Sequence, residues 1–277
     1  MERAFRGLAD IVFGIADLVL PSACAGCAAE RLPLRYGVCA DCVTALEALR
    51  PYATAPAPPP AGMPPVVAVG PYATALRGTL LAYKEKGRHR LARPLGALLA
   101  SAMAQAAGNR TGPLLVLPVP STSEAVRRRH GDHMARLAAH AVRRLRDSGR
   151  QAEVIRPLRA LPRADSASLD AAGRAAAAES SLRIRPGRIP SPARLSTIGG
   201  TLVVVDDIVT TGATLAAVTR RLDEVNLQVA GAAVLAATRL RRRRPDRSFG
   251  LASGMAEWAN RDESVPRTRG DQEASAR

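Results

Sequence analysis

Aromatic residues are scarce in this chain, with three Phe, four Tyr and one Trp among 277 residues. A core must therefore be built mainly from Ala, Val and Leu, and a hydrophobic content of 47% is enough for one.

Long apolar runs are also missing: residues 11–20 are too few to span a bilayer and include Asp17. Asp10 and Asp17 interrupt the apolar centre that a signal peptide needs. We expect a cytoplasmic protein without membrane insertion.

Lysine is nearly absent, because only two of the 40 basic residues are not arginine. The formal net charge of +16 is typical of proteins that bind nucleic acids, but a general excess of arginine weakens that interpretation. Arginines gather locally at 239, 241–244 and 247, in a polar region without periodicity. Residues 241–277 are therefore predicted to form a basic, disordered tail, with contact to a phosphate backbone as the alternative.

Cysteine is absent after residue 42, and the four cysteines form two Cys-x-x-Cys pairs, Cys24 with Cys27 and Cys39 with Cys42. Four thiolates are a tetrahedral ligand set suited to structural zinc, and a closed site of this kind leaves no position open for chemistry. Two disulfides or a redox dithiol are the alternatives. The spacing favours a zinc finger within residues 1–50, where apolar residues at helical spacing over 8–18 predict a helix that packs on it.

Residues 202–214, Leu-Val-Val-Val-Asp-Asp-Ile-Val-Thr-Thr-Gly-Ala-Thr, predict a ligand site. Residues 202–205 are typical of a buried parallel strand, and a helix is expected at 215–225. Ligands of open α/β sheets bind outside the carboxyl ends of strands, and helix starts bind anions. Two adjacent carboxylates suit vicinal hydroxyls and the small loop suits a phosphate, so the run indicates a ribose 5-phosphate site. The candidate residues are Asp206, Asp207, Thr210, Thr211, Gly212, Ala213 and Thr214. The alternative is a buried strand followed by a Thr-capped helix.

Strands and helices alternate along the chain after a proline-rich segment at 51–65, which is expected to be a linker. Such alternation predicts an α/β fold with a doubly wound parallel sheet over residues 66–240. The other expected strands are 66–69, 114–117, 153–155 and 229–236, and the other expected helices are 74–83, 91–107, 133–148 and 170–179.

The 202–214 run resembles the phosphoribosyl pyrophosphate (PRPP) binding motif of type I phosphoribosyltransferases. A four-cysteine finger ahead of such a domain resembles the ComF (competence protein F) family over about residues 15–240. Residues 83–88 resemble the family's Lys-x-x-Gly-Arg stretch. Residues 117–120 and 127–132 resemble its Pro-x-Pro and Arg-rich region, whose aromatic residue and glutamine are absent here. The resemblance implies a type I phosphoribosyltransferase-like sheet, PRPP and Mg²⁺ as ligands, and a link to DNA uptake in natural competence.

The resemblance also implies residue roles. Asp206 and Asp207 would hold the ribose hydroxyls, and the loop from Thr210 to Thr214 the 5-phosphate. The loop at 118–129, which follows the expected strand 114–117, would bind the pyrophosphate through Ser121, Thr122, Ser123 and Arg129, with a solvated arginine face as the alternative. Lys84 and Arg88 are expected near the site or at a solvated helix end, and His130 and His133 at the surface or in support. No general base is predicted, and the acceptor, turnover and oligomeric state stay open.

A different class of function fits the same sequence. The chain would then be a non-catalytic accessory protein that uses the fold to bind single-stranded DNA, a nucleotide or DNA-uptake proteins.

Overall fold

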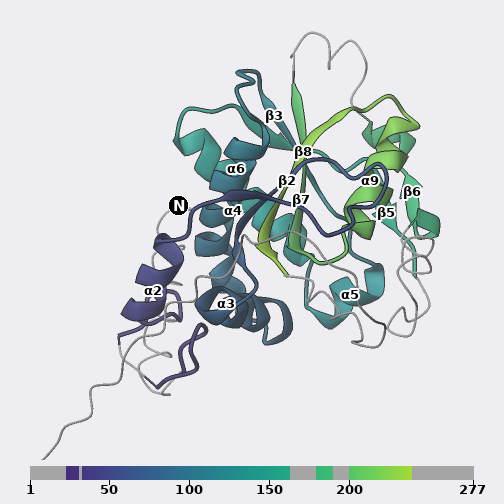
Figure 1. Ribbon diagram of the computed structural model, residues 1–277. Helices are drawn as coiled ribbons and strands as arrows, with labels where there is room; N and C mark the ends of the chain where they lie inside the picture. The colour runs from purple at the N-terminus through teal and green to yellow at the C-terminus, as the bar shows by residue number, and fades with distance from the viewer. Residues whose placement is uncertain (1–22, 31–32, 163–178, 190–199, 239–277) are drawn as a thin grey trace, which may run out of the picture. The chain divides into compact units, whose positions relative to one another are not determined.

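The computed structural model describes residues 23–30, 33–162, 179–189 and 200–238 (Figure 1). The apolar segment at 8–18, nearly all of the helix expected at 170–179 and the basic tail lie outside these residues.

A six-stranded sheet in the order β1-β2-β8-β7-β3-β4 forms the centre of the described structure. Every neighbouring pair in it is parallel except β1 with β2. Side chains are buried without alternation along most of β2, β3 and β7, as expected for parallel strands covered on both faces. The predicted α/β fold with a mostly parallel sheet is therefore confirmed. The strands are β1 Tyr52–Thr54, β2 Val66–Pro71, β3 Leu114–Pro118, β4 Ala152–Val154, β7 Thr201–Val209 and β8 Val229–Ala237.

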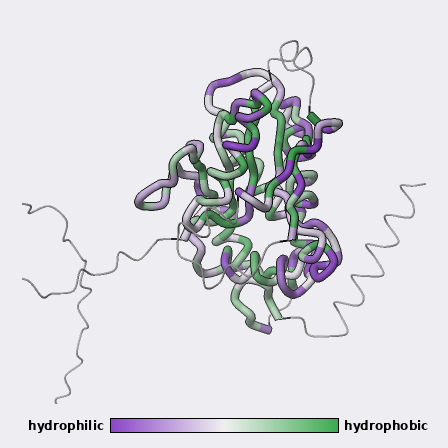
Figure 2. Tube along the Cα trace, turned by 90° about the vertical axis from the view of Figure 1, so that its right-hand side faces the viewer, coloured by the Kyte–Doolittle hydropathy of each residue, from purple (hydrophilic) through white to green (hydrophobic). Residues whose placement is uncertain are grey.

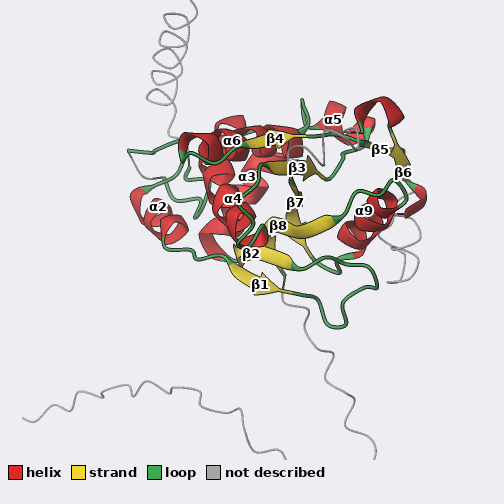
Figure 3. Cartoon of the chain, turned by 90° about the horizontal axis from the view of Figure 1, so that it is seen from above, coloured by secondary structure: helices red, strands yellow, loops and turns green. Residues whose placement is uncertain are grey.

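Helices cover the two faces of the sheet (Figure 3). Val203 and Val205 of β7 belong to one core, together with the buried residues of α4 and α6. Leu202 and Val204 belong to a second core, which includes the buried residues of α9. In Figure 2 the hydrophobic colouring follows these central strands. The helices are α2 Ala40–Glu47, α3 Thr74–Glu85, α4 Ala92–Ala106, α5 Ser123–Arg128, α6 His133–Asp147 and α9 Ala213–Asp223.

The neighbouring strands β3 and β7 lead to opposite faces of the sheet. The chain after β3 reaches α6 on one face, whereas the chain after β7 enters α9 on the other. Such a reversal separates the loops at the carboxyl ends of the two strands and leaves a crevice between them, where ligands of open α/β sheets bind. The fold therefore predicts a ligand site at the carboxyl ends of β3 and β7.

Several short elements differ from the sequence-based expectation. The segment 51–65 contains the edge strand β1, which pairs antiparallel with β2, so this segment is not only a spacer. A two-stranded antiparallel sheet of β5 Leu158–Ala160 and β6 Leu182–Ile184 was not predicted either. Each of these three strands has only three residues, too few to show a periodicity.

The cysteine-containing region packs against α3. Gly26 and Gly78 lie so close that a Cβ on Gly78 would overlap the backbone carbonyl of Gly26. The Arg88 guanidinium also donates to the Ala23 carbonyl at 2.8 Å. The buried cysteines share one hydrophobic core with Leu76 and Leu80 of α3. The finger region is thus part of the packed structure and not a separate appendage.

Candidate functional site

A cavity of about 330 Å³ lies at the carboxyl ends of β3 and β7. Pro118, at the end of β3, pairs with Val205, and the next amide of Val119 donates to the Val205 carbonyl at 2.9 Å. Beyond that point β7 continues only beside β8, because the β3 side has ended. The cavity therefore lies beside the part of β7 that extends past the end of β3 and carries Asp206 and Asp207. Six predicted site residues line it: Ser121, Thr122, Arg129, Asp206, Asp207 and Thr214.

Asp207 is held by two basic side chains. Its Oδ2 lies 2.6 Å from Lys84 Nζ and 3.3 Å from His133 Nε2. Lys84 comes from the last turn of α3, and His133 is the first residue of α6. Burial by itself would raise the pKa of Asp207, but the hydrogen bond with His133 and the ammonium of Lys84 hold that pKa well below its usual range. Asp207 is therefore a charged carboxylate with the Lys84 ammonium as its counter-ion.

Asp206 has a different environment, although it is the next residue on β7. Its Oδ1 accepts the backbone amide of Asp207 at 2.9 Å. Burial, followed by the negative charge of Asp207, raises the pKa of Asp206 to about 7. Near neutral pH the pair therefore carries between one and two negative charges.

The end of α3 connects three parts of the site. Tyr83 donates its hydroxyl to the backbone carbonyl of His133 at 2.8 Å. Burial raises the pKa of this tyrosine to about 12, so it remains a donor at neutral pH. Lys84 pairs with Asp207, and Glu85 pairs with Arg129 at 3.3 Å. Three consecutive residues thus link α3 to α6, to β7 and to the arginine that follows α5.

The predicted phosphate loop reaches the cavity through Thr214, whereas Thr210, Thr211, Gly212 and Ala213 are not among its lining residues. Gly212 precedes α9 with φ of +74°, a conformation that favours glycine. A Cβ there would overlap Met63 Sδ and lie 3.3 Å from Pro56 Cγ, so the 51–65 segment covers this position. The requirement for glycine is thus explained by packing within the chain.

The segment 118–129 was expected to be a loop, but its second half is the short helix α5. Thr122 is the N-cap of this helix, and its hydroxyl accepts the amide of Ala125 at 3.2 Å. Ser121, Thr122 and Arg129 line the cavity beside the carboxylates. Ser123 lines an adjoining cavity of about 350 Å³ instead. The predicted donors are therefore divided between two neighbouring cavities.

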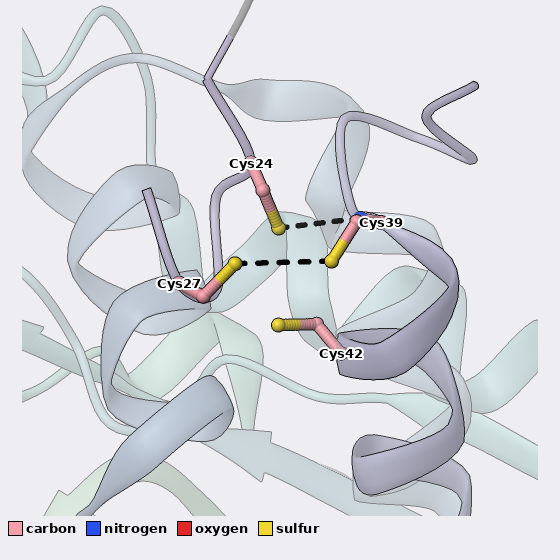
Figure 4. A group of neighbouring side chains, drawn as sticks. All are labelled: Cys24, Cys27, Cys39 and Cys42. Carbon is pink, nitrogen blue, oxygen red and sulfur yellow. Dashed lines mark hydrogen bonds between the residues drawn. The ribbon is translucent and has the colours of Figure 1, made fainter. Parts of the chain in front are cut away.

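The four cysteines form the second candidate site (Figure 4). All four Sγ atoms lie within 4.8 Å of one another, and none forms a disulfide. Cys27 Sγ and Cys39 Sγ are 3.8 Å apart. A tetrahedral site with Zn–S bonds of about 2.3 Å has sulfurs roughly 3.8 Å apart. The cluster can therefore bind a metal ion such as zinc.

The surroundings of Cys24 favour a thiolate. The backbone amides of Cys39 and Gly26 donate to its Sγ at 3.2 and 3.3 Å. Burial opposes ionisation, yet backbone hydrogen bonds lower the pKa of Cys24 to about 6. Burial and the neighbouring thiols raise the pKa of Cys42. A bound cation would remove this imbalance by stabilising all four sulfurs as thiolates.

From the sequence, Lys84 was expected near the site or at a solvated helix end, and His133 at the surface or in support. Both contact Asp207 directly, and His133 is buried. Each lies where a helix end meets the carboxyl edge of the sheet, which is the one sequence signal that points to them. Glu85, which pairs with Arg129, and Glu124, which lines the cavity, were not predicted from the sequence either.

Within the described part of the chain, no helix has the combination of length and apolar character required to cross a membrane. None of the curated proteins matches the sequence. The phosphoribosyl transferase domain model matches residues 137–259. This match includes both carboxylates and Thr214, and it excludes the cysteines, Lys84 and the segment 118–129. The match covers less than half of the chain, and it supports a phosphoribosyltransferase-like domain in that part.

Proposed function

We propose that the cavity at β3 and β7 binds PRPP with Mg²⁺, and that the chain is a cytoplasmic ComF-family protein that acts in DNA uptake during natural competence. The observation that carries the proposal is that residues from the ends of two neighbouring strands, β3 and β7, line one cavity. One end offers Asp206, Asp207 and Thr214, and the other offers Ser121, Thr122 and Arg129. Carboxylates for hydroxyls on one side and hydroxyl and guanidinium donors for phosphates on the other match the chemistry of a phosphorylated ribose.

In this proposal each part of PRPP has its own partners. The carboxylates accept hydrogen bonds from the ribose hydroxyls, and the loop from Thr210 to Thr214 at the start of α9 receives the 5-phosphate. Ser121, Thr122, Ser123 and Arg129 face the pyrophosphate. Mg²⁺ prefers oxygen ligands and is held by carboxylates together with substrate phosphates, so Asp206 and Asp207 fit it. When bound, Mg²⁺ supplies positive charge for the pyrophosphate.

The reaction implied is a substitution at C1 of the ribose. An electron pair from the acceptor forms the new bond to C1, while the C1–oxygen bond breaks and pyrophosphate leaves with its electron pair. The protein contributes position and charge stabilisation, because the transition state resembles an oxocarbenium ion. Arg129 is the side chain best suited to the negative charge that grows on the leaving group.

The four-cysteine cluster, in the same proposal, holds one structural zinc ion. The ligand set is closed, with four sulfurs, three of them on buried residues. The metal would stabilise the finger region that packs on α3, and it would take no part in the substitution.

A second candidate function, a non-catalytic protein that binds single-stranded DNA or nucleotides, is favoured by the charge beside the cavity. The adjoining cavity is lined by Arg156, Arg159 and Arg185, and among the described residues Asp132 is the one acidic residue in its lining. The formal net charge of +16 also favours binding to a nucleic-acid backbone.

One calorimetric experiment separates the two functions. The intact protein is titrated with PRPP and Mg²⁺, and in parallel with a single-stranded oligonucleotide, while pyrophosphate release is followed with candidate acceptors. The proposal expects saturable PRPP binding that weakens in the Asp206→Asn variant. Oligonucleotide binding without any PRPP binding would favour the second function.

A further inference from the structure

The two neighbouring carboxylates of β7 are engaged in different ways. Oδ2 of Asp207 is within bonding distance of two basic groups, Lys84 Nζ and His133 Nε2. Its side chain is only 9% exposed. Asp206, in contrast, is paired in the described structure with a backbone amide, through Oδ1. One carboxylate is thus already compensated inside the protein, and the other keeps Oδ2 for a further donor.

Lys84 is partly available to the cavity. Its side chain is 25% exposed and lines the same cavity as the carboxylates. An ammonium group carries three N–H donors, and the pairing with Asp207 uses one of them. The long lysine side chain is flexible, so a fixed carboxylate beside it decides where the positive charge lies.

We infer that Asp206 and Asp207 have separate tasks: Asp206 contacts the ribose hydroxyls, whereas Asp207 is a positioning residue that fixes the Lys84 ammonium in the cavity, where Lys84 binds the pyrophosphate of the ligand. This inference rests on the proposed function for the identity of the ligand, and it narrows the ribose contact proposed there from both carboxylates to Asp206. The arrangement of Lys84 by Asp207 is a property of the protein without ligand and can be measured on its own.

Physical reasoning favours this division over two equivalent hydroxyl acceptors. Asp207 is buried, and its Oδ2 already accepts from the Lys84 ammonium, so it offers a ribose hydroxyl less acceptor capacity than Asp206 does. Asp206 is only partly buried, and a backbone amide occupies its Oδ1. A cation that is already fixed near the site of the phosphate groups also loses little further conformational entropy when the ligand binds.

The first test needs no ligand and uses the fact that the chain has only two lysines, Lys84 and Lys86. Both are labelled with ¹³C, and their Cε signals are assigned with Lys84→Arg and Lys86→Arg. We expect Asp207→Asn to move the Lys84 signal toward that of the exposed Lys86, and Asp206→Asn to leave it nearly in place. An unchanged Lys84 signal in Asp207→Asn would overturn the positioning role.

The second test compares PRPP with ribose 5-phosphate by calorimetry. Lys84→Met should weaken PRPP binding roughly tenfold or more and leave ribose 5-phosphate binding within about twofold, whereas Lys86→Met, the matched control, should change neither. Asp206→Asn should weaken the binding of both ligands by roughly 10- to 100-fold.

A double-mutant comparison completes the test. If Asp207 acts through Lys84, adding Asp207→Asn to Lys84→Met changes PRPP affinity by less than about twofold, because the two changes remove the same contact. A full additional loss in the double variant, or a loss of ribose 5-phosphate binding in Asp207→Asn, would show that Asp207 itself holds the ribose. If the wild-type protein binds neither ligand, the proposed function fails, while the ¹³C measurement still decides whether Asp207 positions Lys84.

Discussion

The four-cysteine cluster and the carboxylate cavity differ in how completely their polar groups are satisfied. The cluster is closed: four sulfurs lie within 4.8 Å of one another, and backbone amides already donate to Cys24. The cavity is open at the end of β3, and burial, followed by the negative charge of Asp207, raises the pKa of Asp206 to about 7. A closed ligand set suits a permanently held ion, whereas an uncompensated charge in a cavity suits a ligand that comes and goes.

Breaking the closed site should have the largest effect. Structural zinc contributes about 10–16 kcal/mol of apparent binding energy in small fingers, so removal of the metal or Cys39→Ser should unfold the finger region. Because the cysteines share a core with α3, faster hydrogen exchange should extend into α3. The measurements are metal content by mass spectrometry and hydrogen exchange by segment.

Ala45→Ser, at an exposed position of α2, is the control for the added hydroxyl and should behave like the wild type. One zinc ion per chain is expected. Two stoichiometric disulfides without metal would contradict this account of the cluster.

The two carboxylates should respond in opposite ways to neutralisation. Asp207→Asn leaves the Lys84 and His133 side chains without their carboxylate and should lower the free energy of unfolding by roughly 1–3 kcal/mol, less than a fully buried pair because Lys84 is partly exposed. Asp206→Asn removes a charge that burial disfavours and should keep or raise the melting temperature at pH 8. Equal destabilisation by both changes would remove the distinction between them.

Gly212 tests whether the loop before α9 needs glycine for packing. Gly212→Ala should cost about 1–3 kcal/mol, because φ is +74° and the new Cβ overlaps Met63. Gly187→Ala is the control, since a Cβ there meets nothing within 4 Å, and it should be nearly neutral. Thermal unfolding without ligand is sufficient, and a neutral Gly212→Ala would refute the packing explanation.

The pH dependence of ligand binding should follow Asp206. A carboxyl whose pKa is raised to about 7 is largely protonated at pH 6 and ionised at pH 8. If the ionised form accepts the ribose hydroxyls, PRPP affinity should fall roughly tenfold from pH 8 to pH 6.

Stability carries the opposite sign. The ionised form of Asp206 is disfavoured in the fold, so its cost grows as pH rises from about 4 toward 7. For Asp207, whose pKa is lowered, the stabilising contribution is present at neutral pH and is lost in acid.

The control for the affinity prediction is Asp206→Asn. In this variant the loss of PRPP affinity between pH 8 and pH 6 should be clearly smaller than in the wild type. A loss of the same size would assign the titration to another group.

Local sequence pattern was enough to predict the parallel sheet, the strand that leads to Asp206 and Asp207, and the gathering of the cysteines. In each case the deciding residues are close in the chain, as in residues 202–214 or 24–42. The strand itself is longer than predicted, because β8 continues to pair with β7 as far as Val209.

The partners of Asp207 could not be predicted in the same way. Lys84 and His133 reach it from two helices, and only the packing of α3 and α6 on the sheet brings them together. The contact of Gly212 with Met63 likewise depends on the path of the proline-rich segment. Short strands such as β1 lack a periodic signal and form because a neighbouring strand edge is available.

The central claim, that the cavity between β3 and β7 is a PRPP site, is tested most directly by calorimetric titration of the intact protein with PRPP and Mg²⁺ at pH 8, beside the Asp206→Asn variant. The account predicts saturable binding at one site per chain, weakened by roughly 10- to 100-fold in the variant while its melting temperature is maintained. Absence of binding to the wild type, or equal affinity in a folded Asp206→Asn variant, would contradict it.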